Sequence, residues 1–291
     1  MDAADLRLME AVARHGSMNR AAAELNTVQS NVTARIKQLE DQIGVPLFER
    51  HSRGVTPTAA GLRLLPYATR IGQLLKEARA AARDDGTPQG RLHLGTLETT
   101  AALRLPAILA AYAQAHPRVD LVITTGTSCS LIADVIEHRL DGAFVAGPVQ
   151  HADLLAEAVF REELVLITAR SIRTLDDLAS VRDLRTIVFQ LGCSYRQRLE
   201  AILAQRGLQA AQPLEFGSLD AILGCVAAGV GVTLLPKAVA AAARRDGLVT
   251  IHELPAEQAQ VETLFIRRRD SYVTSALAAF LAMARPAPLA A

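Results

Sequence analysis

The sequence lacks the features of disulfide-rich, secreted and membrane proteins. It contains no tryptophan and only three cysteines, Cys129, Cys193 and Cys225, which are too widely spaced for a disulfide framework or a cysteine-based zinc site. The N-terminal segment carries acids where a secretory signal has its apolar core, and no later apolar run is long enough to cross a membrane. These absences predict a cytoplasmic protein without membrane contact.

An excess of charge of one sign is also lacking. The 291 residues hold 31 Lys and Arg against 30 Asp and Glu, which gives a net charge of +1. Residues 1–85 carry 12 basic and 10 acidic residues, so a basic surface that binds nucleic acid must be local. Half of the residues are hydrophobic, which is typical of a folded chain, and the length suffices for two or three domains.

Motifs of common enzyme classes are missing as well. The sequence has no Gly-rich phosphate loop ending in Lys-Ser or Lys-Thr, no HExxH and no GxSxG, and its seven histidines show no metal-ligand spacing. We therefore expect no enzymatic activity, no metal and no cofactor. The alternative is an enzyme, or the solute-binding protein of a transporter, with an unrelated N-terminal helical domain.

A long amphipathic helix is predicted over residues 28–43. Its apolar stripe, with steps of four, four, three and four, consists of Val28, Val32, Ile36, Leu39 and Ile43. The opposite face is free of acids as far as Glu40 and consists of Gln29, Ser30, Asn31, Thr33, Arg35, Lys37 and Gln38. Such amides, hydroxyls and cations suit base edges and phosphates. Taken alone, however, a helix of this kind is more often a solvated surface helix.

The surroundings of this helix favour a role in reading DNA. An apolar stripe over residues 5–14 and the small residues at 21–23 predict two preceding helices, and Asn26 and Thr27 form a short break with Thr27 as the N-cap. A basic hairpin follows, and three helices with such a wing are the helix-turn-helix layout. The candidate DNA contacts are Asn19, Arg20, Gln29, Ser30, Asn31, Thr33, Arg35, Lys37, Arg50 and Arg53.

Residues 1–85 resemble the winged helix-turn-helix of LysR-type transcriptional regulators, through "GSMNRAAAELN", "VQSNVTARIKQLEDQIGVPLFER" and "VTPTAAG". The glutamine that is usual in the family stands at Gln29. Where the family often has Pro, Ala and Arg, this chain has Ser30, Asn31 and Ala34, and Arg35 is expected to supply the cation one position later. The resemblance implies binding to promoter DNA, while these departures leave the operator sequence open.

A second long helix is predicted from Thr58 to about Asp84, with Pro66 inside it as the cause of a bend or an early start. Its apolar positions recur at steps of four and three, and they are Leu64, Ala68, Ile71, Leu75, Ala78 and Ala82. Packing against the chain's own domain is the alternative that periodicity leaves open. The resemblance implies a dimer seam, in a homodimer or a homotetramer, and residues 84–90 are expected to form a hinge.

From Arg91 onward the sequence predicts an α/β fold. Strands at 91–98, 119–126 and 141–147 alternate with helices at 103–115 and 131–140, which implies a parallel sheet. A second unit has strands at 186–190, 214–218 and 231–236 and helices at 195–206 and 219–228, and the apolar strands 163–169 and 263–267 are natural crossovers. This layout resembles the two-lobed effector domain of the same family, whose architecture is that of periplasmic solute-binding proteins.

Three loops rich in hydroxyls and glycine, at 96–100, 125–130 and 191–196, each precede a helix at the place where ligands bind in such folds. Exposed amides and helix dipoles there favour a small anion or carboxylate. The candidate effector contacts are Thr99, Thr100, Thr127, Ser128, Cys193, Ser194 and Ser218. Each hydroxyl is alternatively a simple N-cap, and Cys193 as a redox sensor is the less favoured interpretation because its loop has no second cysteine.

Together these features predict three segments: a winged helix-turn-helix at 1–58, a linker helix with a hinge at 59–89, and an effector-binding domain at 90–291. Lobe I is expected to hold about 90–164 and 267–291, and lobe II about 165–266. We expect a transcriptional regulator whose binding to double-stranded promoter DNA is modulated by a small-molecule effector. RNA polymerase is a further expected partner at the promoter.

Overall fold

The computed structural model describes residues 1–52, 54–181, 183–190, 192 and 194–285. The chain divides into two compact units, Met1–Asp84 and Asp85–Ala291. The division lies at the start of the segment that the sequence predicts to be a hinge. No helix within the described ranges is long and apolar enough to span a membrane.

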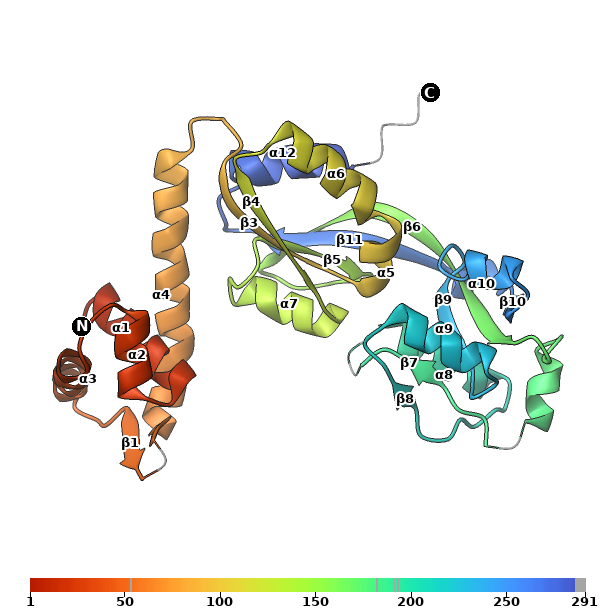
Figure 1. Cartoon of the computed structure of the whole chain (residues 1–291), viewed down its shortest axis with the longest axis horizontal. Helices are drawn as coiled ribbons and strands as arrows, with labels where there is room; N and C mark the ends of the chain where they lie inside the picture. Colours follow the sequence, from red (N-terminus) through yellow and green to blue (C-terminus); the bar gives the residue numbers. More distant parts are fainter. Residues whose placement is uncertain (53, 182, 191, 193, 286–291) are drawn as a thin grey trace. The chain divides into compact units, whose positions relative to one another are not determined.

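The first unit begins with three helices around a shared apolar core. They are α1 (Ala3–His15), α2 (Met18–Glu24) and α3 (Gln29–Ile43) (Figure 1). The apolar stripe predicted for α3 is buried at Val32, Ile36 and Leu39, whereas Val28 and Ile43 at its two ends are exposed. Side chains of all three helices meet in one cluster. The period of the apolar residues therefore predicted this packing, because each helix contributes a single stripe to it.

The turn between α2 and α3 differs in detail from the prediction. Asn26 adopts a left-handed conformation with a φ of 50°, which breaks the helix as expected. The N-cap residue of α3 is Val28, which supplies no side-chain hydrogen bond. The Thr27 hydroxyl instead accepts a hydrogen bond from the side-chain amide of Asn31 at 2.9 Å. The prediction of Thr27 as the N-cap was wrong, because the N-cap position falls one residue later, at Val28. The Thr27 hydroxyl binds the Asn31 side chain and not a backbone amide.

A short hairpin follows α3 and is held against the helical core. It consists of β1 (Phe48–His51) and β2 (Gly54–Pro57), which pair antiparallel. A carboxylate oxygen of Glu40 accepts hydrogen bonds from the backbone amides of Leu47 at 2.7 Å and Phe48 at 3.1 Å. Gly54 has a φ of 136°, and a Cβ atom at this position would lie 2.5 Å from the carbonyl oxygen of Gly16. Only glycine fits this close approach of the wing to the end of α1.

Helix α4 (Ala59–Arg83) completes the first unit and continues through Pro66. Thr58 is its N-cap, as predicted, and the Thr58 hydroxyl accepts a hydrogen bond from the Gly61 amide at 3.0 Å. The predicted apolar seam divides into two parts. Ala68 is fully buried and Leu64 packs against the core of the same unit, whereas Ile71 and Leu75 are 37% and 38% exposed. Packing within the domain therefore accounts for the first half of the seam and leaves the second half uncovered.

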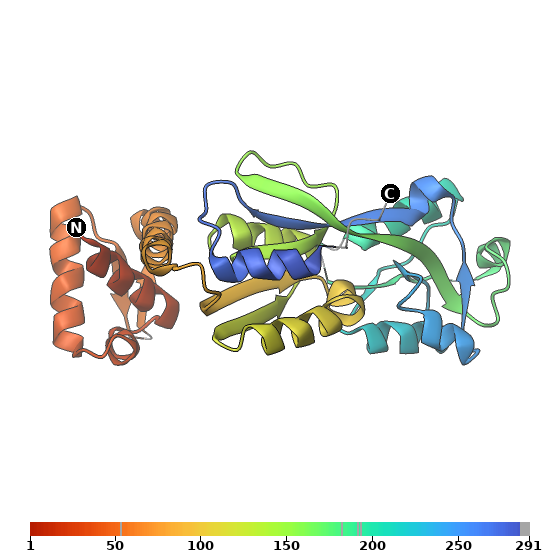
Figure 2. The ribbon, with the colours of Figure 1, turned by 90° about the horizontal axis from the view of Figure 1, so that it is seen from above.

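The second unit contains two lobes. In lobe I, the strands β3 (Gly90–Thr96), β4 (Val119–Thr125) and β5 (Gly142–Ala146) are parallel. The sheet continues antiparallel through β11 (Gln260–Arg268) and the first part of β6 (Leu154–Ala169). Helices α6 (Leu105–Ala115) and α12 (Ser275–Ala284) cover one face, and α7 (Ser128–Ile136) covers the other (Figures 1 and 2). A further short helix, α5 (Glu98–Leu103), follows β3 directly.

Lobe II is built on the second part of β6. This part pairs with β9 (Thr233–Pro236) and β10 (Val249–His252), both antiparallel. The short strands β7 (Ile187–Val188) and β8 (Leu214–Glu215) are parallel, and a bridge from Thr186 to Val232 joins them to the β9 region. The lobe also contains α8 (Ser194–Gln205), α9 (Leu219–Ala227), α10 (Ala241–Arg245), α11 (Ala256–Ala259) and a 3-10 turn at Asp176–Ser180.

The crossovers between the lobes differ from the expected ones in extent. The strand expected at 163–169 is the second part of β6, which begins at Leu154 and spans 16 residues. The strand expected at 263–267 is part of β11, which pairs with β5 over residues 263–266 and with the first part of β6 along its whole length. Residues 260–266 therefore extend the lobe I sheet, although the sequence-based boundary placed them in lobe II.

Candidate nucleic-acid interface and ligand pocket

The exposed face of α3 carries most of the residues selected from the sequence as DNA contacts. Gln29, Ser30, Asn31 and Lys37 are exposed, and Thr33 is half-buried beside them. The first turn of α3 contains no acid and has no side-chain cap, so its backbone N–H groups add to the donors of this end. A helix end with amides, hydroxyls and a cation is the kind of surface that contacts base edges and phosphates.

Arg35, a predicted DNA contact, is engaged by two acids at the start of α1. Its guanidinium donates from Nε to Oδ1 of Asp5 at 2.9 Å and from Nη2 to Oδ1 of Asp2 at 3.2 Å. Asp2 is the N-cap of α1 and forms a capping box with Asp5. Arg35 thus joins α3 to the beginning of α1. Its predicted contact with DNA would require this ion pair to open, so we remove Arg35 from the interface.

Two further segments of the first unit carry candidate DNA contacts. Asn19 and Arg20 are exposed in the first turn of α2, whose N-cap is Ser17. Arg50 is exposed on β1 of the wing, opposite Val55 in the register of the hairpin. Arg53 lies outside the described residues. The interface that remains consists of the exposed face of α3, the start of α2 and the wing.

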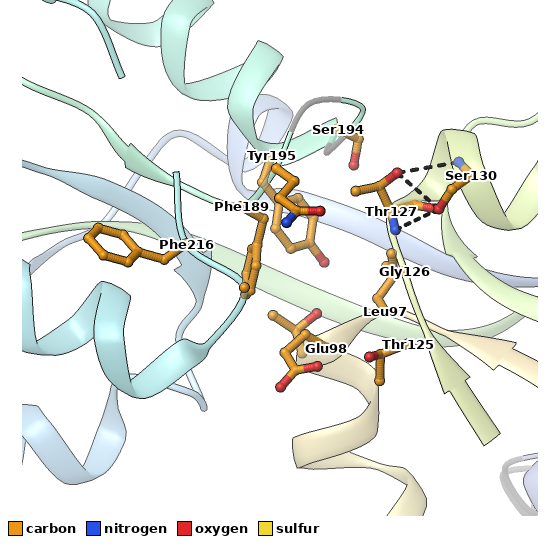
Figure 3. Close-up of a pocket in the computed structure, with 13 residues that line it drawn as sticks. Leu97, Glu98, Thr125, Gly126, Thr127, Ser130, Phe189, Ser194, Tyr195 and Phe216 are labelled. Atoms are coloured by element: carbon orange, nitrogen blue, oxygen red, sulfur yellow. Dashed lines mark hydrogen bonds between the residues drawn. The ribbon is translucent and has the colours of Figure 1, made fainter. Parts of the chain in front are cut away.

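A cavity of about 350 Å³ lies between the two lobes of the second unit (Figure 3). Its lobe I wall comes from the end of β4, from Leu97 just after β3 and from the first residues of the helices that follow these two strands. Its lobe II wall comes from the residues after β7, the start of α8 and the residues after β8. The lining residues are Leu97, Glu98, Thr99, Thr125, Gly126, Thr127, Ser130, Phe189, Gln190, Ser194, Tyr195, Phe216 and Gly217.

The cavity brings together only some of the effector contacts selected from the sequence. Thr99, Thr127 and Ser194 line it. Thr100 and Ser128 are buried away from it, and the Ser128 hydroxyl accepts a hydrogen bond from the backbone amide of Ala146 at 3.2 Å, which ties α7 to β5. The hydrogen bond of Ser128 fixes the start of α7 beside the cavity.

The two remaining candidates do not belong to the described wall. Ser218 occupies the N-cap position of α9, without a side-chain cap hydrogen bond, and is absent from the cavity lining. Cys193 lies outside the described residues. The parts of the predicted site that lie in the cavity are thus the starts of α5, α7 and α8, whereas the start of α9 contributes only through the preceding Gly217 and Phe216.

The hydroxyls of Thr127 and Ser130 also have a structural role. The Ser130 amide donates to the Thr127 hydroxyl at 3.3 Å, and the Thr127 amide donates to the Ser130 hydroxyl at 3.1 Å. This is a capping box at the start of α7. The simpler interpretation of Thr127 as an N-cap is therefore correct, and the same capping box forms one side of the cavity (Figure 3).

Several lining residues are not among the predicted contacts, because the predicted site was based on loops rich in hydroxyls and glycine. The aromatic side chains of Phe189, Tyr195 and Phe216 form much of the lobe II wall. Glu98 is the charged residue among the described lining residues, and its side chain is half-buried. The signal that could have found Phe189 and Phe216 is their position at or just after the ends of short parallel strands, where ligands bind in this architecture.

Comparison with known proteins shows the family to which each of the two units belongs. Residues 3–62 match the family described as "Bacterial regulatory helix-turn-helix protein, lysR family", and residues 85–288 match the "LysR substrate binding domain". The chain is 43% identical over 276 residues to the HTH-type transcriptional regulator GltR of Bacillus subtilis, covering 95% of this chain and 93% of GltR. It is 41% identical over 281 residues to the HTH-type transcriptional regulator CzcR of Bacillus anthracis, covering 97% and 96%.

Solved structures give the same result. Full-length CbnR in complex with its target DNA is similar, with a TM-score of 0.67, 25% identity and coverage of 98% of this chain and 99% of CbnR. Full-length OxyR from Pseudomonas aeruginosa has the same fold, with a TM-score of 0.69, 20% identity and coverage of 98% and 93%. The relatives are transcriptional regulators and not enzymes. The chain belongs to the LysR family of bacterial transcriptional regulators, with a DNA-binding helix-turn-helix unit followed by an effector-binding domain.

Proposed function

We propose that this regulator reads promoter DNA through the exposed face of α3, supported by the start of α2 and by the wing. The observation that carries the proposal is the absence of acids from Gln29 to Leu39 on a helix whose other face is buried in the core at Val32, Ile36 and Leu39. Gln29, Ser30 and Asn31 are suited to base edges, and Lys37, Arg20 and Arg50 to phosphates. Cations at three separate elements would fix the register of α3 in the groove.

We further propose that α4 pairs with α4 of a second copy. Beyond Ala68 the helix exposes Ile71, Leu74 and Leu75, whose exposed fractions are 37%, 45% and 38%. With the exposed Tyr67, the spacing from 67 to 71 to 74 is that of a coiled-coil seam. A two-fold pair would present two copies of α3 to successive major-groove faces, roughly 34–36 Å or a multiple apart.

The ligand of the interlobe cavity is proposed to be a small molecule with a carboxylate or another anionic group. Support comes from the hydroxyls of Thr127, Ser130 and Ser194, which lie together at the starts of α7 and α8. Binding there would change the angle between the lobes, and the energy available is the difference in affinity for the two arrangements, typically about 1–3 kcal/mol.

The cellular location and a contact with RNA polymerase are proposed from promoter binding alone, and no residue is proposed for them. We propose that the regulator acts in the cytoplasm, where the chromosome of a bacterium lies, and that it meets RNA polymerase at the promoter. Whether the assembly is a dimer or a tetramer would follow from its mass in solution.

The DNA proposal is tested by selecting binding sites from a random duplex library with the purified full-length protein. The selected sequence is expected to contain two related half-sites, and binding to it should weaken steeply between 50 and 200 mM salt, by about 10³-fold or more if six or more phosphates are contacted. Gln29→Ala should reduce the preference for the selected sequence over a scrambled one. Lys37→Gln should weaken binding to both equally and reduce the salt dependence.

Thr56→Ala on β2 is a suitable companion variant, because Thr56 is exposed on the wing but carries no charge. It should leave the salt dependence unchanged. Failure to enrich any sequence, at either salt concentration, would contradict the assignment of α3 as the reading helix.

A further inference from the structure

The interlobe cavity carries a negative charge at one of its sides. Glu98 is the charged residue among the described residues that line it. Its carboxylate makes no hydrogen bond or ion pair within the part of the chain that the structure describes. A carboxylate beside a partly enclosed cavity repels an anionic group placed next to it and attracts a cation.

No arginine or lysine of the described residues lines the cavity to balance Glu98. Two arginines that are near the lining residues in sequence have other partners. Arg104 donates to Glu162 at 2.8 Å, and Arg196 donates to Glu200 at 3.0 Å and to Glu215 at 2.6 Å. The negative charge of Glu98 is thus left to be matched by whatever enters the cavity.

The arrangement of the wall separates Glu98 from the hydroxyls. In Figure 3 the side chains of Thr127, Ser130 and Ser194 gather at one side of the cavity, and Glu98 lies with Thr125 at the other. The ring of Tyr195 is drawn between the two groups, and the ring of Phe189 is drawn beside it. Aromatic faces stabilise a cation or an apolar group beside them, and they exclude water from both.

We infer that the effector of this regulator carries a cationic nitrogen that binds to the carboxylate of Glu98, so that the cavity accepts a zwitterion of the amino-acid type. This inference rests on the proposed function, since it names the chemistry of the ligand at the same site. In a zwitterion the ammonium group donates to Glu98, the carboxylate lies at the hydroxyls beside the starts of α7 and α8, and an apolar side chain lies against Phe189. Such a ligand satisfies both sides of the cavity, whereas a simple carboxylic acid satisfies one.

The test uses three sets of probes that differ in charge and share a side chain. L-phenylalanine, L-leucine and L-alanine are compared with the amines that lack the carboxylate and with the acids that lack the ammonium group. For phenylalanine these are 2-phenylethylamine and 3-phenylpropionate. Binding to the full-length protein is measured by calorimetry near pH 7, with each probe up to 10 mM.

At least one ammonium-bearing probe is expected to bind about tenfold or more tightly than the acid with the same side chain, which is the usual strength of one charge-assisted hydrogen bond. In Glu98→Gln this preference should disappear, while the acids bind as well as or better than they bind to the unaltered protein. Retained binding of the acids also shows that the variant is folded. Glu257→Gln is the matched control, because Glu257 is an exposed acid in the first turn of the short helix α11, and it should keep the preference.

The inference is overturned if the acids bind most tightly, if no ammonium-bearing probe binds, or if the preference survives in Glu98→Gln. DNA binding is measured in parallel on the same protein preparations. Specific DNA binding without any preference for ammonium probes removes the inference and leaves the proposed DNA function intact. Loss of specific DNA binding by the unaltered protein removes the proposed function itself.

Discussion

Replacement of Arg35 should weaken the packing of α3 on α1 and should not remove a direct DNA contact. The side chains of Arg35 and Asp5 are 31% and 15% exposed, and their hydrogen bond of 2.9 Å spans 30 positions of the sequence. A charge-assisted hydrogen bond contributes roughly 1.5–3 kcal/mol when buried, and partial exposure reduces this to about 1–2 kcal/mol. Since 1.4 kcal/mol corresponds to a factor of ten, local opening should become about 5–30 times more frequent in Arg35→Gln.

Hydrogen exchange of the full-length protein, read by mass spectrometry, measures this opening directly. Peptides that cover α1 and α3 should exchange faster in Arg35→Gln by the factor given above, while peptides of the effector-binding domain should not change. The affinity for a non-specific duplex at fixed salt should change by less than about twofold, since no phosphate contact is lost.

A double-mutant cycle with Asp5→Asn separates the ion pair from other effects of the substitution. In the Asp5→Asn background, Arg35→Gln should cost less than in the unaltered protein, with a coupling of about 1 kcal/mol. Lys37→Gln is the comparison on the same helix, because Lys37 is exposed and forms no ion pair with a described residue. It should weaken DNA binding without accelerating exchange. Unchanged exchange in Arg35→Gln, together with a tenfold or greater loss of DNA affinity in both backgrounds, would refute the structural role.

Three further outcomes can be measured on other elements. Gly54→Ala should destabilise the first unit by about 2 kcal/mol or more, seen as a lower unfolding temperature, because its Cβ atom would lie 2.5 Å from the Gly16 carbonyl oxygen at a φ of 136°. Ile71→Glu should dissociate the dimer proposed to form through α4, as measured by light scattering, whereas Lys76→Glu, at an exposed position off the apolar stripe, should not. Burial raises the pKa of Tyr112 to about 12. The neutral Tyr112 therefore contributes its full stability below pH 10, and this contribution should be lost as the pH rises toward 12. Denaturant titrations at pH 9 and pH 11.5 would measure the difference in the free energy of unfolding.

The helices of the first unit could be predicted because their signals are local. Each helix shows its apolar stripe within a dozen residues, and Thr58 marks the start of α4 by its own side chain. The partner of Arg35 could not be predicted in this way. A cation on the polar face of a helix looks the same in sequence whether it contacts DNA or an acid 30 residues earlier, since only the packing of α3 on α1 decides this.

The apolar seam of α4 is a second case in which the sequence pattern does not show what a side chain contacts. Leu64 and Ile71 belong to one apolar series, and periodicity treats them alike. In the fold, Leu64 packs against the core of its own unit, whereas Ile71 lies beyond the reach of that core. Helix α4 is longer than the core of its own unit, so its apolar residues pack against that core at one end and are uncovered at the other. The residue at which the packing ends depends on the size of the folded unit, which periodicity does not show.

Only the second part of strand β6 was predicted, because the two parts of the strand differ in burial. Residues 164–169 are buried on both faces and read as an apolar run, which the sequence shows directly. Residues 154–163 mix apolar residues with exposed charged ones and lack an uninterrupted apolar run, although they pair with β11 along their length. The aromatic residues of the cavity were missed for a different reason, because the prediction used only loops rich in hydroxyls and glycine.

The path of β6 limits how a ligand can act on this domain. Along the described residues the chain passes from lobe I to lobe II near Glu163 and returns through the segment between β10 and β11. Lys237 connects the two crossover segments, since its Nζ atom lies 3.4 Å from Oε1 of Glu163 and 2.8 Å from Oε1 of Glu253. Lobes joined in this way can change their angle, and a ligand shifts that angle only if it binds one arrangement more tightly than the other. A compound that contacts Thr127 on lobe I without reaching Phe189 on lobe II has no such preference, so it would occupy the cavity and leave DNA binding unchanged.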